Sequence, residues 1–464
     1  MTQPEKPKWF VLARRQAAAA QPFSKTRPAI TRQRNANSLL LSLVLLSMLL
    51  GPVPIHIADR SPNLFFGDPL LALAAAYAFA HRRSVQASDR MIRSAVVWMG
   101  LYCMVILATL PMAVDILRTT AYLKLYVMPF LAFVTAIRLF QSPSDLDRVL
   151  LTCAVVGVGL SIGALLNWWL YQSGALELSS ELGAKDMVQM AGTRSNTVAG
   201  TAALLLPGAL FAFWQKKKRW RAVGAVALVG LCGTITFSMS RGAVVSAVLG
   251  VGSSLVRLPR LRSTGHAWKA MKATVALVAC ACLSWLLFPA DLQRTFLGHL
   301  EQARLELTQT PEKNDRLSRW GVLIEEGLKN PWGVGVGNYE YVSSAASQQM
   351  GGSAHNLYLE TLNEAGWLAL VALVMCLTRI WRAITRRGRS GTSERFAWMA
   401  VSMVFWVFAI NVAVEPNYFS GPFTYVFWIT MGTAVAASHR RCSGPQLARL
   451  VSGSTRNLCI PSHG

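Results

Sequence analysis

The sequence predicts an all-α protein, a polytopic integral membrane helix bundle of about 12 transmembrane helices. Of its 464 residues, 53% are hydrophobic and only 15% are charged, and the mean hydropathy is +0.36. Apolar runs near the ~20 residues that a helix needs to cross a bilayer recur along the whole chain. A membrane β-barrel would instead require short segments of alternating hydrophobicity. The sequence contains none, so we predict helices.

The predicted spans divide the chain into five parts. Residues 1–37 form a basic cytoplasmic tail that we expect to be disordered, and residues 439–464 form a second cytoplasmic tail. Helices one to nine occupy 38–289, and helices ten to twelve occupy 357–438. Between them lies a long outer, periplasmic loop at 290–356. The spans are placed at 38–57, 64–81, 94–113, 121–140, 149–171, 197–214, 222–238, 243–257, 270–289, 357–378, 396–414 and 421–438.

The formal net charge of +24 would suit a nucleic-acid-binding protein if the basic residues formed one soluble patch. With the N-terminus inside, however, most Lys and Arg fall in the predicted cytoplasmic segments, and the outer segments are net acidic. The clusters at 216–219 (KKKR) and 386–389 (RRGR) are both inside. This is the positive-inside pattern. We therefore predict that both termini are cytoplasmic and that the basic clusters meet membrane lipids rather than nucleic acid.

The long outer loop contains two stretches with helical periodicity. Residues 292–307 have an imperfect period, and residues 315–329 have a cleaner one. In the second stretch Trp320, Leu323, Ile324 and Leu328 fall on one face. Long ordered loops in compact proteins are usually functional. We therefore expect a helical cap over the outer end of the bundle.

Basic residues in the outer segments are informative because the topology rule disfavours them there. Arg194 lies just before the sixth span, and Arg241 lies at the turn between the seventh and eighth. Arg316 and Arg319 open the second loop helix, and His355 precedes the tenth span. Guanidinium groups bind phosphate oxygens bidentately. The pattern therefore predicts a site for an anion at the bilayer surface, such as a lipid pyrophosphate.

Each of these residues also has a structural interpretation. Arg194 and Arg241 could extend toward lipid headgroups, and Arg319 could form an ion pair within its own helix. Asn196 and Asn356, which directly precede the sixth and tenth spans, are typical N-cap residues. Helix N-termini at these positions would add backbone N–H donors to an anion site.

Four motifs occur in an order that resembles the O-antigen ligase and O-antigen polymerase superfamily of bacterial envelope glycosyltransferases. They are residues 192–196 (GTRSN), 240–242 (SRG), 316–320 (RLSRW) followed by 330–339 (NPWGVGVGNY), and 355–360 (HNLYLE) followed by 364–366 (EAG). The resemblance covers roughly residues 190–375. The glycine run at 333–337 lacks the Lys-Ser/Thr of a P-loop and lies on the outer side, so we reject a nucleotide-binding interpretation.

The resemblance implies a metal-independent glycosyltransferase of the bacterial inner membrane that uses no cofactor and has a periplasmic active site. Its donor would be a glycan linked to undecaprenyl diphosphate. Arg194, Arg241 and Arg316 match the family motifs and would hold the diphosphate, with Arg319 and Glu415 as further candidates. His355 would act with Arg241 at the reacting centre. It would either deprotonate the acceptor hydroxyl or bind phosphate.

The acceptor distinguishes the possible reactions. A ligase would use lipid A-core in lipopolysaccharide biosynthesis, and a polymerase would extend another lipid-linked glycan. The single medium-length loop before His355 resembles the ligase arrangement, which we favour. A protein O-oligosaccharyltransferase is a weaker alternative, as is a polysaccharide transporter. Transport usually needs ionisable residues in the span interiors, and the predicted spans carry few of them. The oligomeric state stays open.

Overall fold

A computed structural model describes residues 27–50, 52–53, 64–80, 90–140, 143–173, 195–238, 240–255, 315–338, 355–387, 395–415, 417 and 421–439, with isolated positions between 279 and 301. These residues form twelve α-helices, which confirms the predicted fold class. Seven of the described helices are long and apolar enough to cross a membrane. The chain is therefore a polytopic helical membrane protein.

Each predicted span except the ninth contains a described helix. The ninth, at 270–289, lies almost entirely outside the described residues, as does the loop stretch at 292–307. The helices are α2 (Arg27–Ser47), α3 (Gly67–Ala80), α4 (Arg90–Ala108), α5 (Ile116–Leu139), α6 (Pro143–Gln172), α7 (Ser195–Phe213), α8 (Lys218–Phe237), α9 (Arg241–Leu255), α12 (Asp315–Lys329), α14 (Leu357–Arg387), α15 (Arg395–Val414) and α16 (Gly421–His439).

The first helix is displaced from its predicted position. We expected a span at 38–57, but α2 runs from Arg27 to Ser47, and a 3-10 turn, η2 (Met48–Leu50), follows it. Proline has no N–H for a helical hydrogen bond, so Pro52 prevents continuation. Instead β1 (Pro52–Val53) pairs antiparallel with β2 (Leu64–Phe65). Residues 27–37, which we assigned to a disordered tail, belong to α2, where Asn37 Nδ2 donates to Leu139 O at 3.2 Å.

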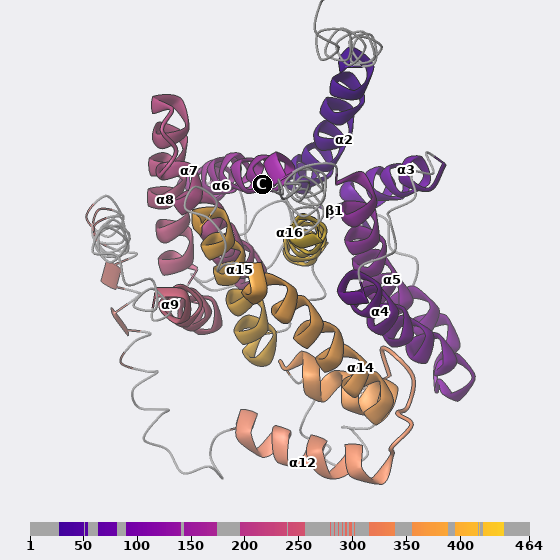
Figure 1. Ribbon diagram of the computed structural model, residues 1–464. Helices are drawn as coiled ribbons and strands as arrows, with labels where there is room; N and C mark the ends of the chain where they lie inside the picture. The colour runs from indigo at the N-terminus through magenta and orange to yellow at the C-terminus, as the bar shows by residue number, and fades with distance from the viewer. Residues whose placement is uncertain are drawn as a thin grey trace, which may run out of the picture.

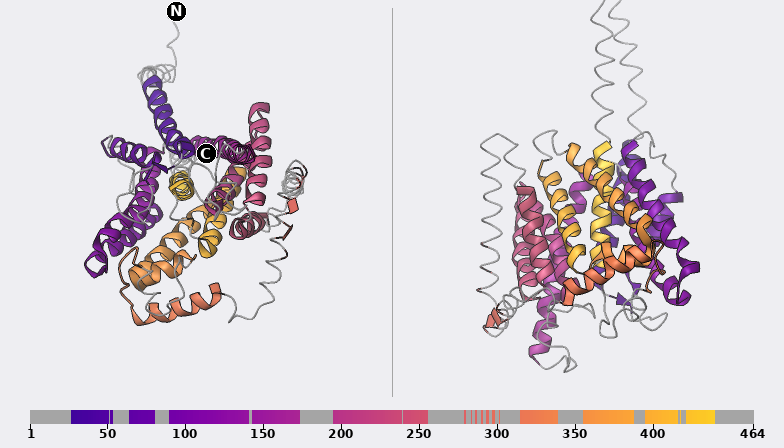
Figure 2. Two further views of the ribbon diagram at one scale, coloured as in Figure 1. Left: turned by 180° about the vertical axis from the view of Figure 1, so that it is seen from behind. Right: turned by 90° about the horizontal axis from the view of Figure 1, so that it is seen from below.

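The helices stand side by side around α16, which is seen nearly end-on in Figure 1. We call the end where α3, α7, α9, α14 and α16 begin the predicted outer end, and the opposite end the predicted inner end. At the outer end Tyr425 donates a hydrogen bond to Asp68, which Lys124 also approaches at 2.8 Å. In Figure 2, α12 lies across the flank of the bundle rather than parallel to the spans.

Helix α7 is the most enclosed part of the core. Ala199, Ala202, Ala203 and Ala209 are all fully buried. A Cβ added at Gly208 would lie 2.7 Å from Cys153 Cβ and 2.8 Å from Leu150 O on α6. Small residues of this kind let membrane helices approach closely. The tight packing fixes the position of α7 in the bundle. Asn196 lies at the outer end of this helix.

Candidate active site

Glu415, at the end of α15, is the point where several predicted motifs meet. Its side chain is 2% exposed. Oε2 lies 3.9 Å from His355 Nδ1 and accepts a hydrogen bond from Asn196 Nδ2 at 3.4 Å. The absence of a side chain at Gly242 makes room for it, since an added Cβ would overlap the Glu415 side chain. Residues from α7, α9 and the start of α14 therefore surround one buried carboxylate.

Two buried amides close to Glu415 in the sequence form a ladder of hydrogen bonds with a serine of α9. Asn417 Nδ2 donates to Asn411 Oδ1 at 2.8 Å, and Asn411 Nδ2 donates to Ser246 Oγ at 3.2 Å. The side chains of Asn411, Asn417 and Ser246 are at most 1% exposed. Buried polar networks of this kind rigidify the elements they join. The ladder joins the end of α15, from which Glu415 N donates to Asn411 O, to α9.

His355 occupies an unusual backbone conformation. Its φ of 54° is the only positive value at a non-glycine residue in the described part of the chain. Such conformations are uncommon and cluster at functional sites. The next residue, Asn356, caps α14 as predicted, since its Oδ1 accepts from Tyr358 N at 3.0 Å and Leu359 N at 3.2 Å. The imidazole is 30% exposed, so a substrate can reach it beside Glu415.

The predicted arginines are placed to different extents. Arg241 is the first residue of α9 and is exposed, directly before Gly242. Arg194 lies outside the described residues. Arg316 and Arg319 lie in the first turns of α12, but their side chains are outside the described part. We predicted Asn196 as the N-cap of the sixth span, and this prediction was wrong. Because α7 begins at Ser195, Asn196 lies inside the helix, and its side chain donates a hydrogen bond to Glu415.

The second loop helix is present as predicted, as α12. Part of its predicted apolar face is buried against α14, and part of it is exposed. Leu323 is 2% exposed and packs toward α14, where Asn363 Nδ2 donates to Leu323 O at 3.0 Å. An added Cβ at Gly327, one turn on, would lie 2.7 Å from Leu362 Cγ. Ile324 and Leu328, which we placed on the same face, are 48% and 62% exposed. Close contact at Gly327 turns them away from α14.

The glycine run after α12 has a structural role. Gly333, Gly335 and Gly337 all have positive φ, a region that glycine adopts without steric cost. Helix α14 is interrupted at Gly366, where φ is 79°. Val334 N donates to Asn363 O and Gly335 N to Glu364 O, both at 3.0 Å, and Trp367 N donates to Pro331 O at 3.0 Å. The run thus satisfies backbone groups that the break exposes, as membrane proteins require.

The same loop is also anchored to α5. Asn338 is fully buried, accepts from Asp115 N at 3.0 Å and donates to Thr119 Oγ1 at 2.6 Å. Arg118, next to Thr119, is 9% exposed and lies 5.5 Å from the Tyr122 ring centre. Arg118 was not among the predicted site residues, although it is a basic residue in a predicted outer turn, between the spans at 94–113 and 121–140.

Further carboxylates lie inside the outer half of α14. Glu360 and Glu364 are 2% and 3% exposed, and Tyr126 donates to Glu364 Oε2 at 3.1 Å. Among the described residues, no group of three or more His, Cys, Asp or Glu is arranged to hold a metal ion.

The fold and this cluster define a class: a polytopic helical membrane protein with a histidine–carboxylate pair at one end of its bundle. Residues 226–374 match the O-antigen ligase family. This similarity, over about a third of the chain, confirms the resemblance to the ligase and polymerase superfamily. The matched range contains Arg241, Arg316, Arg319 and His355, whereas Arg194 and Glu415 lie outside it. No curated protein matches the chain.

Proposed function

We propose that the protein is a ligase-type glycosyltransferase that moves a glycan from undecaprenyl diphosphate to lipid A-core at the periplasmic face of the bacterial inner membrane. The supporting observation is the convergence of Asn196, Gly242 and His355 on Glu415. Three segments far apart in the sequence meet there, and two of them belong to the family domain.

In this proposal, the arginines provide the electrostatic catalysis. Arg194, Arg241, Arg316 and Arg319 bind the diphosphate of the donor. As the bond between the sugar C1 and the diphosphate oxygen breaks, the bonding electrons remain on the diphosphate. Preorganised cations stabilise negative charge that develops in a transition state. The reaction therefore needs no metal ion, and undecaprenyl diphosphate is the leaving group.

His355 acts on the acceptor. The acceptor hydroxyl oxygen attacks C1, a new C–O bond forms, and the hydroxyl proton passes to His355 Nε2. Glu415, 3.9 Å from Nδ1, orients the ring and stabilises the imidazolium that forms. Carboxylates have this role beside catalytic histidines in other enzymes. In the alternative role, a protonated His355 binds phosphate, and Glu415 stabilises its positive charge.

A polymerase is the second candidate, since it shares the donor and differs only in the acceptor. The single loop at 290–356 favours the ligase. The test is transfer by the purified protein in liposomes that contain a host undecaprenyl-diphosphate-linked glycan, with EDTA present. One assay adds lipid A-core, and the other adds only more lipid-linked glycan. We expect glycosylated lipid A-core in the first. Lengthening of the lipid-linked glycan alone would establish a polymerase, and transfer in neither assay would contradict both.

A further inference from the structure

A groove of about 330 Å³ lies near the predicted inner end, between α2, α6 and α8. Its walls are apolar along most of their length, with Leu39, Leu46, Leu151 and Val155 as the main contributors. Leu39 is 60% exposed and Val155 is 38% exposed. Arg148 and Trp220, near the first turns of α6 and α8, also line it. The groove therefore combines an apolar channel with a cationic group at the end nearest the predicted cytoplasm.

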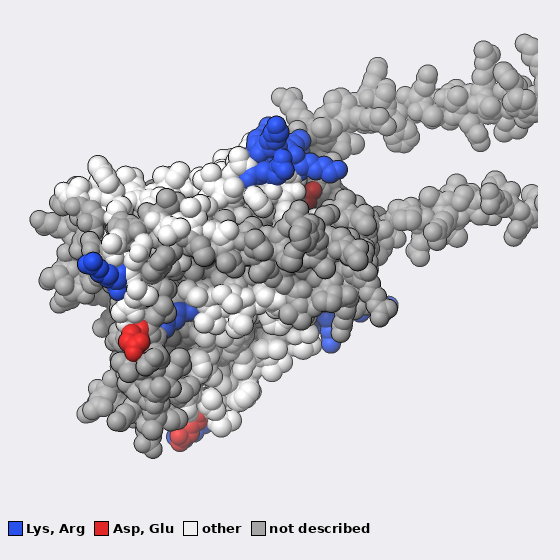
Figure 3. All heavy atoms as spheres, turned by 90° about the vertical axis from the view of Figure 1, so that its left-hand side faces the viewer, with Lys and Arg blue, Asp and Glu red and all other residues white. Residues whose placement is uncertain are grey.

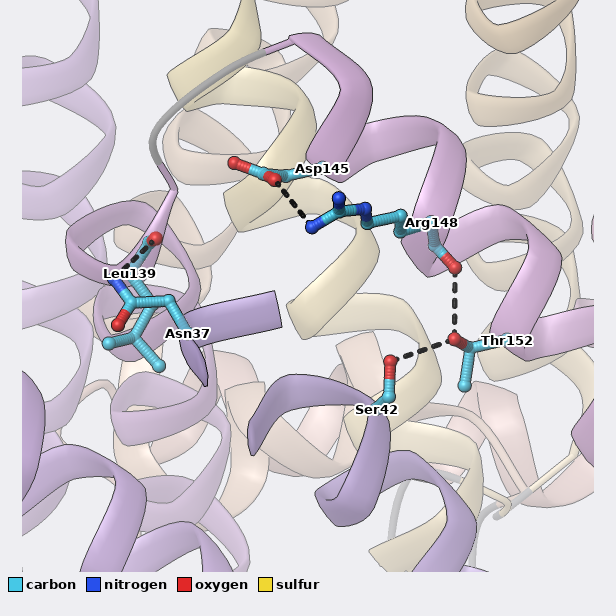
Figure 4. A network of polar contacts seen from close by, with 6 residues as sticks. All are labelled: Asn37, Ser42, Leu139, Asp145, Arg148 and Thr152. Atoms are coloured by element: carbon cyan, nitrogen blue, oxygen red, sulfur yellow. Dashed lines mark hydrogen bonds and ion pairs between the residues drawn. The ribbon is translucent and has the colours of Figure 1, made fainter. Parts of the chain in front are cut away.

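The two hydroxyl groups that line the groove do not need water as a hydrogen-bond partner. Ser42 on α2 and Thr152 on α6 share a hydrogen bond of 2.9 Å, and Thr152 Oγ1 also donates to Arg148 O at 2.9 Å. Figure 4 shows these two hydroxyls facing one another below Arg148. Since both are satisfied within the protein, the space above them favours a hydrocarbon chain over water.

Basic side chains lie at the mouth of the groove. The Arg148 side chain is 40% exposed, and its nitrogen lies 3.9 Å from Oδ1 of buried Asp145, which is longer than a hydrogen bond. Arg219 lies 5.6 Å from the Trp220 ring centre. In Figure 3, Lys and Arg side chains cluster at one edge of the flank on which α8 lies. The exposed cations of the α7–α8 connection and of the first turn of α8 are Lys216, Lys217, Lys218, Arg219 and Arg221, and the nearby acidic residues of α6 are Asp145 and Asp147.

We infer that this groove binds one anionic phospholipid of the cytoplasmic leaflet. An acyl chain lies along the leucine-lined channel, and the phosphate accepts hydrogen bonds from Arg148 and the basic residues that begin α8. Basic pockets between membrane helices on the cytoplasmic side are suited to anionic headgroups. The site lies at the end of the bundle opposite His355 and Glu415, so it is separate from the proposed active site. A bound lipid would fill the gap between α2 and α8.

The test measures lipid binding by native mass spectrometry of the delipidated protein, titrated with phosphatidylglycerol or phosphatidylcholine. Arg148→Gln removes the cation, and Leu151→Trp fills the channel. Arg386→Gln is the matched control, because Arg386 is an exposed arginine at the same predicted end on α14. We expect phosphatidylglycerol to bind more tightly than phosphatidylcholine. Arg148→Gln should weaken it about 10-fold, the effect of losing one charge-assisted hydrogen bond.

Leu151→Trp should prevent binding of both lipids, while Arg386→Gln should behave as wild type. Because Arg148 also approaches Asp145, the double variant Asp145→Asn/Arg148→Gln provides a neutral version if the single variant unfolds. Equal affinity for the two phospholipids, or equal loss in the Arg148 and Arg386 variants, would overturn the inference. Displacement of phosphatidylglycerol by equimolar undecaprenyl phosphate would assign the groove to a polyisoprenyl lipid instead and would also overturn it.

Discussion

Glu415 Oε2 lies 3.9 Å from His355 Nδ1, although the two residues come from the end of α15 and the turn before α14. Both are held rigidly, Glu415 by the buried amides and His355 by a left-handed turn followed by the Asn356 cap. If the pair takes part in proton transfer, the negative charge of Glu415 matters more than the shape of its side chain. Glu415→Gln keeps the shape and removes the charge.

We therefore expect Glu415→Gln to reduce glycan transfer by at least about 10-fold, a part of the effect of a general base. The measurement is the rate of product formation in liposomes at saturating donor. Glu325→Gln is the control, since Glu325 is 68% exposed on α12 and forms only an ion pair with Lys329. Unchanged transfer in Glu415→Gln, with a normal thermal unfolding midpoint, would exclude Glu415 from the mechanism.

A second prediction uses the contact between Gly242 and Glu415. Gly242→Ala places a methyl group where the Glu415 side chain lies, so the carboxylate must move away from His355. We expect transfer to fall by about as much as in Glu415→Gln. Gly252→Ala on the same helix is the matched control, because an added Cβ there has no neighbour within 4 Å. If both alanine variants keep full activity, the position of Glu415 does not matter.

The sequence predicted the helical class and the second loop helix because both depend on hydrophobic periodicity, which is a local property. It also placed His355 and Glu415 at the same predicted end of the bundle, where their side chains lie 3.9 Å apart. It did not predict their contact, since residues 60 positions apart meet only through the packing of α15 against α9 and α7. Asn196 shows most clearly what a local pattern cannot predict. Its position at a helix start predicted an N-cap, but in the folded protein its side chain donates a hydrogen bond to the Glu415 carboxylate.

The sequence pattern did not predict the break in α14 either. The Glu364-Ala365-Gly366 motif continues an apolar helical pattern, and a single glycine in such a pattern is usually tolerated within a helix. The partner that stabilises the break is the glycine run more than twenty residues upstream, whose N–H groups bond Asn363 O and Glu364 O. Only the folded arrangement shows that these two glycine motifs form one unit.

This unit gives a third prediction. Gly366→Ala puts a side chain at φ 79° and against the backbone of Pro331 and Trp332. The strain of a left-handed non-glycine residue is about 1–3 kcal/mol, and the contact adds to it. We expect a clear fall in the thermal unfolding midpoint in detergent. Gly321→Ala on α12, which meets no atom within 4 Å, should leave the midpoint unchanged or raise it. Equal midpoints in the two variants would contradict the role of the break.

Substitution of His355 separates its two possible roles. A base must accept a proton, so His355→Gln and His355→Arg should both reduce transfer by about 100-fold or more. A phosphate ligand needs only positive charge and donors, so His355→Arg should then retain much of the activity that His355→Gln loses. The measurement is transfer by the three proteins at equal donor concentration. We expect both variants to be inactive, and rescue by arginine would assign His355 to phosphate binding.

The last prediction concerns the exposed side of α12. Ile324 and Leu328 are exposed on one side of this helix, while Glu325 and Lys329 are paired at 2.9 Å on the adjacent, polar side. Hydrogen bonds with Glu325 and Glu326 raise the pKa of Lys329 above its ordinary value, as expected for a charged, water-facing side. Trp332, which follows the helix, is 69% exposed, and Trp367 and Leu368 on the adjoining α14 are 42% and 48% exposed. An amphipathic helix that continues a lipid-facing surface lies in the membrane interface.

We therefore expect nitroxide labels at Ile324→Cys and Leu328→Cys to be accessible to oxygen and shielded from a polar nickel reagent in liposomes. The label at Glu325→Cys should show the reverse, all in a background without reactive native cysteines. Because Arg316 and Arg319 lie on the same helix, insertion of Ile324 and Leu328 would hold them at the height of lipid phosphates. Equal access of the nickel reagent to all three labels would place α12 in water, and the two arginines would then need another means of reaching a lipid diphosphate.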